Sequence, residues 1–407
     1  MRFSALLGLA LAASCARTPA VSTTLASDDA LTRAREMHSR IITIDTHDDI
    51  PFNFATAEVD PLNADRQVNL EKMKAGGLDV GFFIVYVGQG PRTPEGNDSA
   101  NARARTKFDA IHRMVRTYPA RITLATSPDD VERAKREGKH AAAIGIENGY
   151  VIGRDLALIE EYHKLGARYM TLAHGRNNDI CDSSTDPDGP EHNGLSAFGR
   201  EVVKEMNRLG MMVDISHVSR DCMMQATALS TLPVIASHSS TKAFADVPRN
   251  LDDDQLRAIA RNGGVAQMVA LGNYVKVDPP QKRAAIDSLR RTMGIRGGRG
   301  AMASLTAEQR AEYQSRLREI EVQWPGPNIA DFVNHIDHAV KVAGIDHVGI
   351  SSDFDGGGGI TGWRDASETM NVTAELIRRG YSEADIRKLW GGNTLRVWRA
   401  NQRGPAS

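Results

Sequence analysis

The stretch RIITIDTHDDIP, from Arg40 to Pro51, begins as a strand of Ile and Thr and stops abruptly at a histidine followed by two aspartates. An apolar run of this kind is typical of a strand that is covered on both faces, as in a parallel sheet. Its acidic end has an ordinary explanation, because strand ends lie at the surface and Asp begins turns or caps helices. The alternative is a metal site, because His47 and Asp49 point the same way from an extended end.

Further apolar runs of the same kind follow along the chain, separated by stretches with amphipathic helical patterning such as 155–165, 196–209 and 252–262. This alternation is typical of an α/β fold, a (β/α)8 TIM-like barrel, with an open doubly wound sheet as the alternative. RITLATS, at 121–127, is an extra short strand candidate. The other runs are VGFFIVYV (80–87), AAAIGIE (141–147), RYMTLAH (168–174), MMVDISH (211–217), PVIASH (233–238), GVAQMVAL (264–271) and DHVGISSDFD (346–355).

The overall composition is that of an ordinary globular protein. The chain has 407 residues, of which 41% are hydrophobic and 25% are charged. A formal net charge of -1 gives no electrostatic reason to expect nucleic acid or an anionic membrane surface as the partner. We therefore expect a small-molecule partner.

Residues 1–15 predict an export signal, with Arg2 ahead of an apolar run and small residues just before Cys15. The apolar run is too short to span a membrane. Ala-Ala-Ser directly before Cys15 resembles a bacterial lipoprotein processing site, so we expect either a membrane anchor through a lipidated Cys15 or ordinary cleavage. Both routes place the mature protein in the bacterial periplasm or on a membrane facing it, and residues 16–30 would form a tether.

Residues 31–407 predict a single (β/α)8 domain. Its one clear shift in composition is the charged, helix-forming stretch at about 279–323, which we interpret as a helical insertion after the seventh strand. Cys181 and Cys222 are the cysteines of the mature chain, and their neighbours give no sign of proximity. We expect two separate thiols, and neither lies in a metal-binding cysteine spacing.

Strand after strand in this pattern ends on a polar residue that can bind a metal ion or move a proton. All strands of a barrel deliver their C-terminal ends to one face, where the active sites of this fold are built. A single histidine at a strand end is usually solvated, but so many such ends indicate a shared site. These residues are His47, Asp49, Glu147, His174, His217, His238 and Asp353.

The residue types at these ends suit divalent metal ions. Imidazole nitrogens and carboxylate oxygens without a thiolate are typical ligands of zinc, with a position left open for water. Five protein ligands are too many for one catalytic zinc, so two ions that share a bridging carboxylate fit better. Glu147 follows small and apolar residues, where an uncompensated buried charge would be costly, and this favours a ligand over a helix cap. His217 and His238 would by default be core histidines, but their matched positions after VDIS and VIAS favour ligands.

Seven motifs in register resemble the membrane (renal) dipeptidase family, the zinc peptidases of family M19: IDTHDDIP, GIENG, LAHGRNND, DISHVS, PVIASHSS, VPRNLDD and HVGISSDFDG. GGNTLRVW near Asn393 resembles the last helix of that family, so the resemblance covers nearly all of the mature chain. It implies a (β/α)8 barrel with a binuclear zinc site at its C-terminal face and hydrolysis of dipeptides by a metal-bridging hydroxide. It also suggests tolerance for a D-configured C-terminal residue and a homodimer.

The resemblance implies a division of the metal ligands. His47 and Asp49 would bind one zinc ion, and His217 and His238 would bind the other. Glu147 would bridge the two ions. Other divalent metals, such as cobalt or manganese, suit the same nitrogen and oxygen ligands.

The resemblance also implies the catalytic and substrate-binding residues. Asp353 would carry the proton from the attacking water to the leaving amine, with Asp355 of the same turn as its competitor. His174 would contact the substrate and stabilise the oxyanion. Arg249 would bind the terminal carboxylate of the substrate, and Tyr274 would line the substrate pocket.

Three other functions remain open from the sequence. The first is a different barrel metallohydrolase acting on cyclic amides, esters or phosphotriesters, whose usual first-strand signature is His-x-His rather than the His-x-Asp seen here. The second is a member of the same family that tailors a peptide natural product in the periplasm. The third is a non-catalytic binding protein, which the presence of every expected ligand disfavours.

Overall fold

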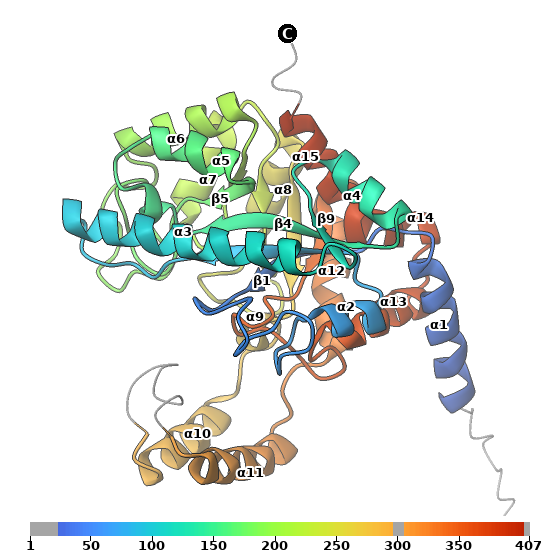
Figure 1. The fold of residues 1–407 in the computed structure, drawn as a ribbon. Helices are drawn as coiled ribbons and strands as arrows, with labels where there is room; N and C mark the ends of the chain where they lie inside the picture. The colour runs from blue at the N-terminus through green and yellow to red at the C-terminus, as the bar shows by residue number, and fades with distance from the viewer. Residues whose placement is uncertain (1–22, 296–304, 403–407) are drawn as a thin grey trace, which may run out of the picture.

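The computed structural model describes residues 23–295 and 305–402, and it places parallel strands at the centre of a ring of helices (Figure 1). Each strand of the barrel path is mostly buried, as expected for strands with helices on the outside and packed side chains on the inside, whereas the extra strand β3 is only partly buried. The strands are β1 (Ile44–Asp49), β2 (Val80–Tyr86), β3 (Ile122–Leu124), β4 (His140–Glu147), β5 (Ala167–Thr171), β6 (Met212–Asp214), β7 (Ile235–Ala236), β8 (Val265–Val269) and β9 (Val348–Ser351).

The sheet closes on itself almost completely. Its described strands pair in the order β1-β2-β4-β5-β6-β7-β8-β9, and the extra strand β3 pairs with β4 beside this path. Just beyond β9, Asp48 and Phe354 form a parallel bridge, and the N–H of Asp49 donates to the carbonyl of Phe354 at 2.9 Å. These contacts join the last strand to the first. The predicted (β/α)8 barrel is therefore confirmed.

Amphipathic helices surround the barrel. Those expected at 155–165, 196–209 and 252–262 are present, and the last begins with a reciprocal capping box between Asp252 and Gln255. The helices flanking the strands are α2 (Leu70–Gly76), α3 (Pro94–Thr117), α4 (Pro128–Arg136), α5 (Ala157–Lys164), α6 (Ala197–Leu209), α7 (Arg220–Leu229), α8 (Asp253–Asn262), α9 (Gly272–Val275), α12 (Ile329–Ala343), α13 (Thr369–Arg378), α14 (Glu383–Arg387) and α15 (Asn393–Gln402). Short 3₁₀ turns lie at Gly149–Ile152, Ile345–His347 and Ala366–Glu368, and a π-helical turn lies at Lys388–Gly392.

Two further helices project from the barrel between β8 and β9 (Figure 1). They are α10 (Pro280–Thr292) and α11 (Ala307–Gln323), and they fall in the stretch expected to be an insertion. Leu289, Ile295 and Tyr313 form a small buried cluster in this region, separate from the two clusters of the barrel. The insertion thus has its own minor core.

The N-terminal helix α1 (Thr23–His38) begins inside the stretch 16–30 that we expected to be a tether. From Ala26 onward the sequence is rich in Ala, Leu and Arg, which favour helix over an extended polar linker. The predicted export signal, Cys15 and the first part of the tether lie outside the described residues. None of the helices in the described ranges is long and apolar enough to span a membrane.

The interior of the barrel is filled by aromatic and aliphatic side chains. The ring of Tyr169 packs on Phe82 with 5.3 Å between centroids, and Trp398 from α15 packs on the same phenylalanine at 5.5 Å. Gly145 makes room for Tyr169, because a Cβ atom at this position would lie 2.2 Å from a ring carbon of the tyrosine. This interior layer supports the strand ends above it.

Cys181 and Cys222 are free, buried thiols, as expected, but they are not far apart. Ser183 and Val218 pair as an antiparallel bridge, which brings the two segments side by side. Burial and a hydrogen bond with the thiol of Cys181 raise the pKa of Cys222. No local pattern in the sequence indicates this proximity, because it arises from pairing between two loops.

Candidate metal centre and substrate pocket

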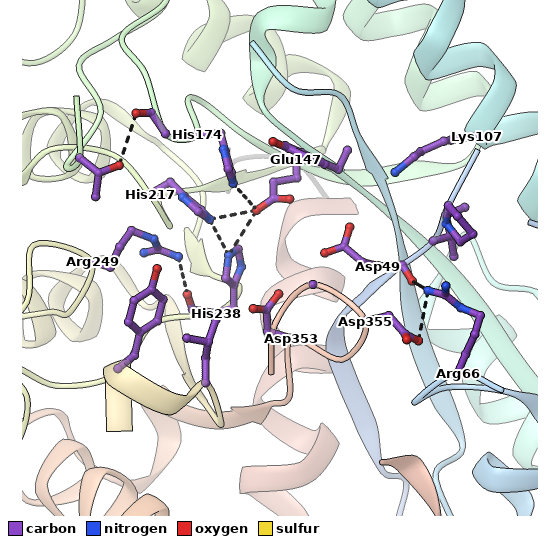
Figure 2. A pocket seen from close by; sticks show the side chains of 18 residues that line it. Asp49, Arg66, Lys107, Glu147, His174, His217, His238, Arg249, Asp353 and Asp355 are labelled. Atoms are coloured by element: carbon purple, nitrogen blue, oxygen red, sulfur yellow. Dashed lines mark hydrogen bonds and ion pairs between the residues drawn. The ribbon is translucent and has the colours of Figure 1, made fainter. Parts of the chain in front are cut away.

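A pocket of about 520 Å³ opens at the C-terminal ends of the barrel strands (Figure 2). The structure brings all of the predicted site residues to this pocket. His47 has no exposed surface and lies within 4.0 Å of three carboxylates that line the pocket. The other predicted residues line it directly: Asp49, Glu147, His174, His217, His238, Arg249, Tyr274 and Asp353.

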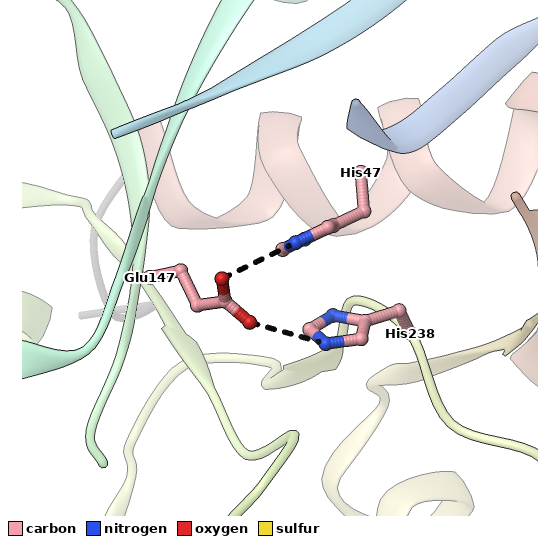
Figure 3. A group of neighbouring side chains, drawn as sticks. All are labelled: His47, Glu147 and His238. Carbon is pink, nitrogen blue, oxygen red and sulfur yellow. Dashed lines mark ion pairs between the residues drawn. The ribbon is translucent and has the colours of Figure 1, made fainter. Parts of the chain in front are cut away.

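Glu147, at the end of β4, lies between two groups of histidines. Its Oε1 atom is 2.9 Å from Nε2 of His217 and 3.4 Å from Nε2 of His238. Its Oε2 atom faces Nε2 of His47 at 3.6 Å. Figure 3 shows His47 and His238 reaching the carboxylate through different oxygen atoms. This is the position that a bridging carboxylate between two cations requires.

The potential ligand atoms form three overlapping groups, in each of which they lie within 4.8 Å of one another. Glu147 belongs to two of the groups and His47 belongs to two, so the groups are continuous. Two adjacent cations therefore fit the arrangement better than a single isolated one. The groups are His47, Glu147 and His238; Glu147, His174 and His217; and His47, Asp49 and Asp353.

A hydrogen bond on the far side of His47 determines which nitrogen faces Glu147. The hydroxyl of Tyr169 donates to the carbonyl of Thr46 at 2.9 Å, so it accepts from Nδ1 of His47 at 3.1 Å. Nε2 of His47 is buried and has no hydrogen-bond partner among the described residues. An imidazole held in this way directs its free nitrogen at a cation, as metal-binding histidines do.

His238 is oriented by the same device. The hydroxyl of Ser237 donates to Asp214 at 2.7 Å and therefore accepts from Nδ1 of His238 at 2.8 Å. Nε2 of His238 then points at Glu147 and lies 2.8 Å from Nε2 of His217. Two imidazole nitrogens converge on one point beside a carboxylate, which fits a shared cation.

The electrostatics of the site favour positive charge. Burial lowers the pKa of His47, but the carboxylates of Glu147 and Asp49 outweigh burial and raise this pKa to about 9. Burial likewise raises the pKa of Glu147, but the surrounding imidazoles outweigh it and hold this pKa well below its usual range. A proton thus occupies His47 when no cation is bound. The donor set fits divalent metal ions.

Strained backbone positions hold three of the side chains at the pocket, one of them Asp355 with a φ value of 63°. His217 and Asp353 have φ values of 67° and 57°, in the left-handed region that most residues avoid. Gly356 allows the loop after β9 to pass close to the site, because a Cβ atom there would lie 2.2 Å from Oδ2 of Asp49 and 2.4 Å from Oδ1 of Asp353. This loop conformation places Oδ1 of Asp353 3.9 Å from Nε2 of His47.

Asp355, the alternative candidate for proton transfer, instead binds the loop that contains Arg66, Gln67 and Val68. Its carboxylate accepts from the backbone N–H groups of Gln67 and Val68, both at 3.1 Å, and lies 3.2 Å from Arg66. These contacts occupy both of its oxygen atoms. The geometry therefore favours Asp353 as the group available for proton transfer.

Arg249 lies buried at the side of the pocket next to His238. Its Nη2 atom donates to the carbonyl of His238 at 3.0 Å, and its Nη1 atom donates to Ser239 at 3.3 Å. The guanidinium lies over the ring of Tyr274, 5.4 Å from the ring centroid. Its Nε atom has no hydrogen-bond partner within the described part of the chain. The arginine is fixed in place with donor capacity left for an anion.

His174, at the end of the run that follows β5, faces the open part of the pocket. Its Nε2 atom is 3.5 Å from Oε1 of Glu147, and its side chain keeps 28% of its surface exposed. The ring packs between Tyr86 at 4.7 Å and His217 at 4.1 Å, measured between centroids. It is the most accessible imidazole of the site, which suits contact with a substrate.

Two cationic side chains of the pocket were not predicted from the sequence: Arg66 and Lys107. Arg66 donates to the backbone carbonyl of Asp49 at 2.8 Å. Lys107 comes from α3 and is 3% exposed, and burial lowers its pKa to about 8. The signal that could have revealed Lys107 is its place on the apolar face of this helix, next to Phe108 and one turn after Ala104.

Comparisons with known proteins agree with this geometry. The model of the membrane dipeptidase family (peptidase family M19) matches residues 31–405. Dipeptidase tcpJ of Claviceps purpurea (strain 20.1) is 33% identical over 341 residues, which cover 82% of this chain and 68% of that protein. Dipeptidase verJ of Clonostachys rogersoniana is 31% identical over 393 residues, which cover 93% of this chain and 89% of that protein. The crystal structure of the probable dipeptidase PvdM from Pseudomonas aeruginosa has a TM-score of 0.81 and 35% identity, covering 92% of this chain and 99% of that one.

Proposed function

The chain belongs to the membrane dipeptidase family, peptidase family M19, and is a metallo-dipeptidase; we propose that it uses two zinc ions to hydrolyse L-Xaa-L-Xaa and L-Xaa-D-Xaa dipeptides. The observation that carries the two-ion proposal is the position of Glu147, whose two oxygen atoms face His47 on one side and His217 and His238 on the other. One carboxylate can then serve both ions.

We assign His47 and Asp49 to one zinc ion, His217 and His238 to the other, and Glu147 to both. Nε2 of His174 is 3.5 Å from Oε1 of Glu147, so His174 could also bind a metal ion. Its partly exposed ring is better placed to contact the substrate. When bound, the ions would polarise the scissile carbonyl and lower the pKa of the attacking water. The remaining steps fall to side chains of the chain itself.

Asp353 is the proposed proton carrier. It would accept a proton from the attacking water and deliver it to the amine nitrogen as the peptide bond breaks. His174 would donate a hydrogen bond to the carbonyl oxygen as negative charge develops there. Both groups line the same pocket as the metal ligands, so they can act on one substrate molecule.

Arg249 would set the length of the substrate. A guanidinium fixed beside His238 can pair with a free carboxylate that lies one residue beyond the scissile bond. A longer peptide would place its carboxylate past the arginine. This limits hydrolysis to dipeptides, and Tyr274 would hold the guanidinium in position from the other side.

The test is the metal content of the purified mature protein, measured together with cleavage of a panel of L-Xaa-L-Xaa and L-Xaa-D-Xaa dipeptides. We expect close to two zinc ions per chain and cleavage that stops when a chelator is added. Glu147→Gln should lose both metal and activity, whereas Glu201→Gln, at an exposed ion pair on α6, should lose neither. Two bound metal ions without dipeptide cleavage would overturn the assignment of dipeptides as the substrate. The absence of bound metal when metal is supplied in excess would overturn the assignment of the metal ligands.

We also propose that the protein is exported, either as a soluble periplasmic protein or as one anchored to the membrane by a lipid on Cys15. The support is the sequence alone, namely the signal-like residues 1–15 and the small residues before Cys15. Mass spectrometry of the mature N-terminus would reveal a lipidated Cys15 or an ordinary cleavage product. A homodimer is a further proposal that rests on the family resemblance, and light scattering of the mature protein tests it.

A further inference from the structure

Lys107 presents an unpaired ammonium group to the pocket. Its side chain is 3% exposed, yet it forms no hydrogen bond and no ion pair with any residue in the described ranges. Its Nζ atom lies over two aromatic rings, 5.1 Å from the centroid of Phe52 and 5.6 Å from that of Tyr86. In Figure 2 its amine end points toward the middle of the pocket, near Glu147 and Asp49. A buried ammonium without a hydrogen bond or an ion pair is costly unless a ligand supplies one.

The other cations of the pocket are held in place by hydrogen bonds or an ion pair. Arg66 pairs with Asp355 at 3.2 Å and donates to the carbonyl of Asp49. Arg249 is held by His238 and Ser239. The carboxylates that act electrostatically on Lys107 are those of Asp49 and Glu147, which we assign to the metal ions. Those carboxylates would then be neutralised by the metals, so Lys107 needs another anion.

Lys107 and Arg249 lie on opposite sides of Glu147 (Figure 2). Arg249 is beside His238, whereas Lys107 is on the side of Asp49. In the proposed function Arg249 holds the C-terminal carboxylate, and the scissile carbonyl lies over the metal ligands between the two cations. The first residue of the dipeptide must then extend toward Lys107.

We propose that Lys107 binds a carboxylate on the side chain of the first residue, so that the preferred substrates are dipeptides beginning with Glu or Asp. This inference rests on the proposed function and adds the substrate class to it. The rings of Phe52 and Tyr86 hold the lysine side chain by cation–π contact and leave its ammonium facing the substrate. A charge-assisted hydrogen bond in this water-poor corner selects an acid over its neutral amide.

The experiment compares kcat/KM for Glu-Ala and Gln-Ala, which differ only in the charge of the first side chain. The wild-type enzyme should prefer Glu-Ala by at least about 10-fold, as expected for one charge-assisted hydrogen bond. Lys107→Met should bring the ratio close to one, and Lys107→Arg should retain much of the preference. Arg103→Met is the matched control, because Arg103 lies over the same Phe52 ring at 4.7 Å but is exposed and does not line the pocket.

A second readout does not depend on turnover. Calorimetric titration of the zinc-loaded protein should show that L-glutamate binds at least about 10-fold more tightly than L-glutamine, and that Lys107→Met removes this difference. Zinc content and melting temperature measured on the same samples show whether the variant is folded. A wild-type Glu-Ala to Gln-Ala ratio near one, or a ratio that Lys107→Met leaves unchanged, would overturn the role of Lys107. Failure to cleave any dipeptide would instead overturn the proposed function, and the glutamate titration would then decide on Lys107 by itself.

Discussion

Nδ1 of His47 lies 3.1 Å from the hydroxyl oxygen of Tyr169, and this contact determines which nitrogen of the imidazole faces Glu147. The hydroxyl of Tyr169 donates its hydrogen bond to the carbonyl of Thr46, so it can only accept a hydrogen bond from His47. Gly145 provides the space that the tyrosine ring occupies. Tyr169, in the interior layer of the barrel, thereby determines which nitrogen atom His47 presents to the metal site at the open end.

Tyr169→Phe should weaken metal binding without disturbing the barrel. The ring remains, but Nδ1 of His47 loses its acceptor, and loss of such a partner typically lowers metal affinity about 10–100-fold. Competition with a chromophoric chelator measures the change. Tyr162→Phe is the matched control, because its buried hydroxyl bonds to Asn101 and Val151, neither of which lines the pocket. Equal affinities of the two variants would contradict the orienting role of Tyr169.

Asp353→Asn and Asp355→Asn should fail in different ways. The first should lower kcat by about 10²–10⁴ while metal content and stability stay near wild type, because it removes the proposed proton carrier. The second should lower the free energy of unfolding by about 1–3 kcal/mol, because Asp355 accepts from Gln67 and Val68. Single-turnover kinetics and urea unfolding separate the two effects. A larger loss of kcat in Asp355→Asn than in Asp353→Asn would reverse the assignment.

Arg249→Lys should lower kcat/KM for dipeptides about 10–100-fold, because an ammonium cannot reproduce a planar guanidinium held by His238 and Ser239. Dipeptide amides, which lack the terminal carboxylate, serve as the comparison substrate. Wild-type enzyme should discriminate strongly against the amide, and the variant should do so much less. Retention of the wild-type discrimination would exclude Arg249 as the carboxylate-binding residue.

The strands and the metal-ligand candidates could be predicted because each carries a local signal. A buried strand is a continuous apolar run, and a strand end such as His47 or Glu147 interrupts that run with a group that needs a cation. The barrel then follows from the alternation of strands with helices. The beginning of α1 at Thr23 was missed because a short polar stretch gives little periodicity to read.

Other features depend on the folded arrangement more than on any local signal. Lys107 reaches the pocket from α3, which is not a strand end, so the rule that active sites lie at strand ends did not select it. Cys181 and Cys222 become neighbours through pairing of their two segments, which includes the bridge between Ser183 and Val218. Choosing between Asp353 and Asp355 as the proton carrier depended on knowing that backbone N–H groups donate to the carboxylate of Asp355. In each case the decisive contact joins segments that are distant in the sequence.

His38 should make the fold sensitive to acid. It is buried in α1, with Nε2 2.7 Å from the Thr373 hydroxyl, and burial lowers its pKa from 6.5 to about 4. Between these two pH values His38 binds a proton in the unfolded chain but not in the folded protein. The stability present above pH 6.5 is therefore lost as the pH falls toward about 4. The loss attributable to His38 is on the order of 3 kcal/mol.

Urea unfolding of the metal-free protein, wild type against His38→Gln, measures this loss. The free energy of unfolding of the variant, relative to that of wild type, should rise by about 2–3 kcal/mol when the pH is lowered from 7.5 to 4.5. The reason is that glutamine takes up no proton in the folded or the unfolded state. Between pH 7.5 and pH 8.5 the difference should stay constant, since His38 is then neutral both folded and unfolded. Chelator in both samples keeps metal loss from contributing to the difference. Parallel curves for the two proteins over the acid range would mean that His38 is not the group that resists protonation.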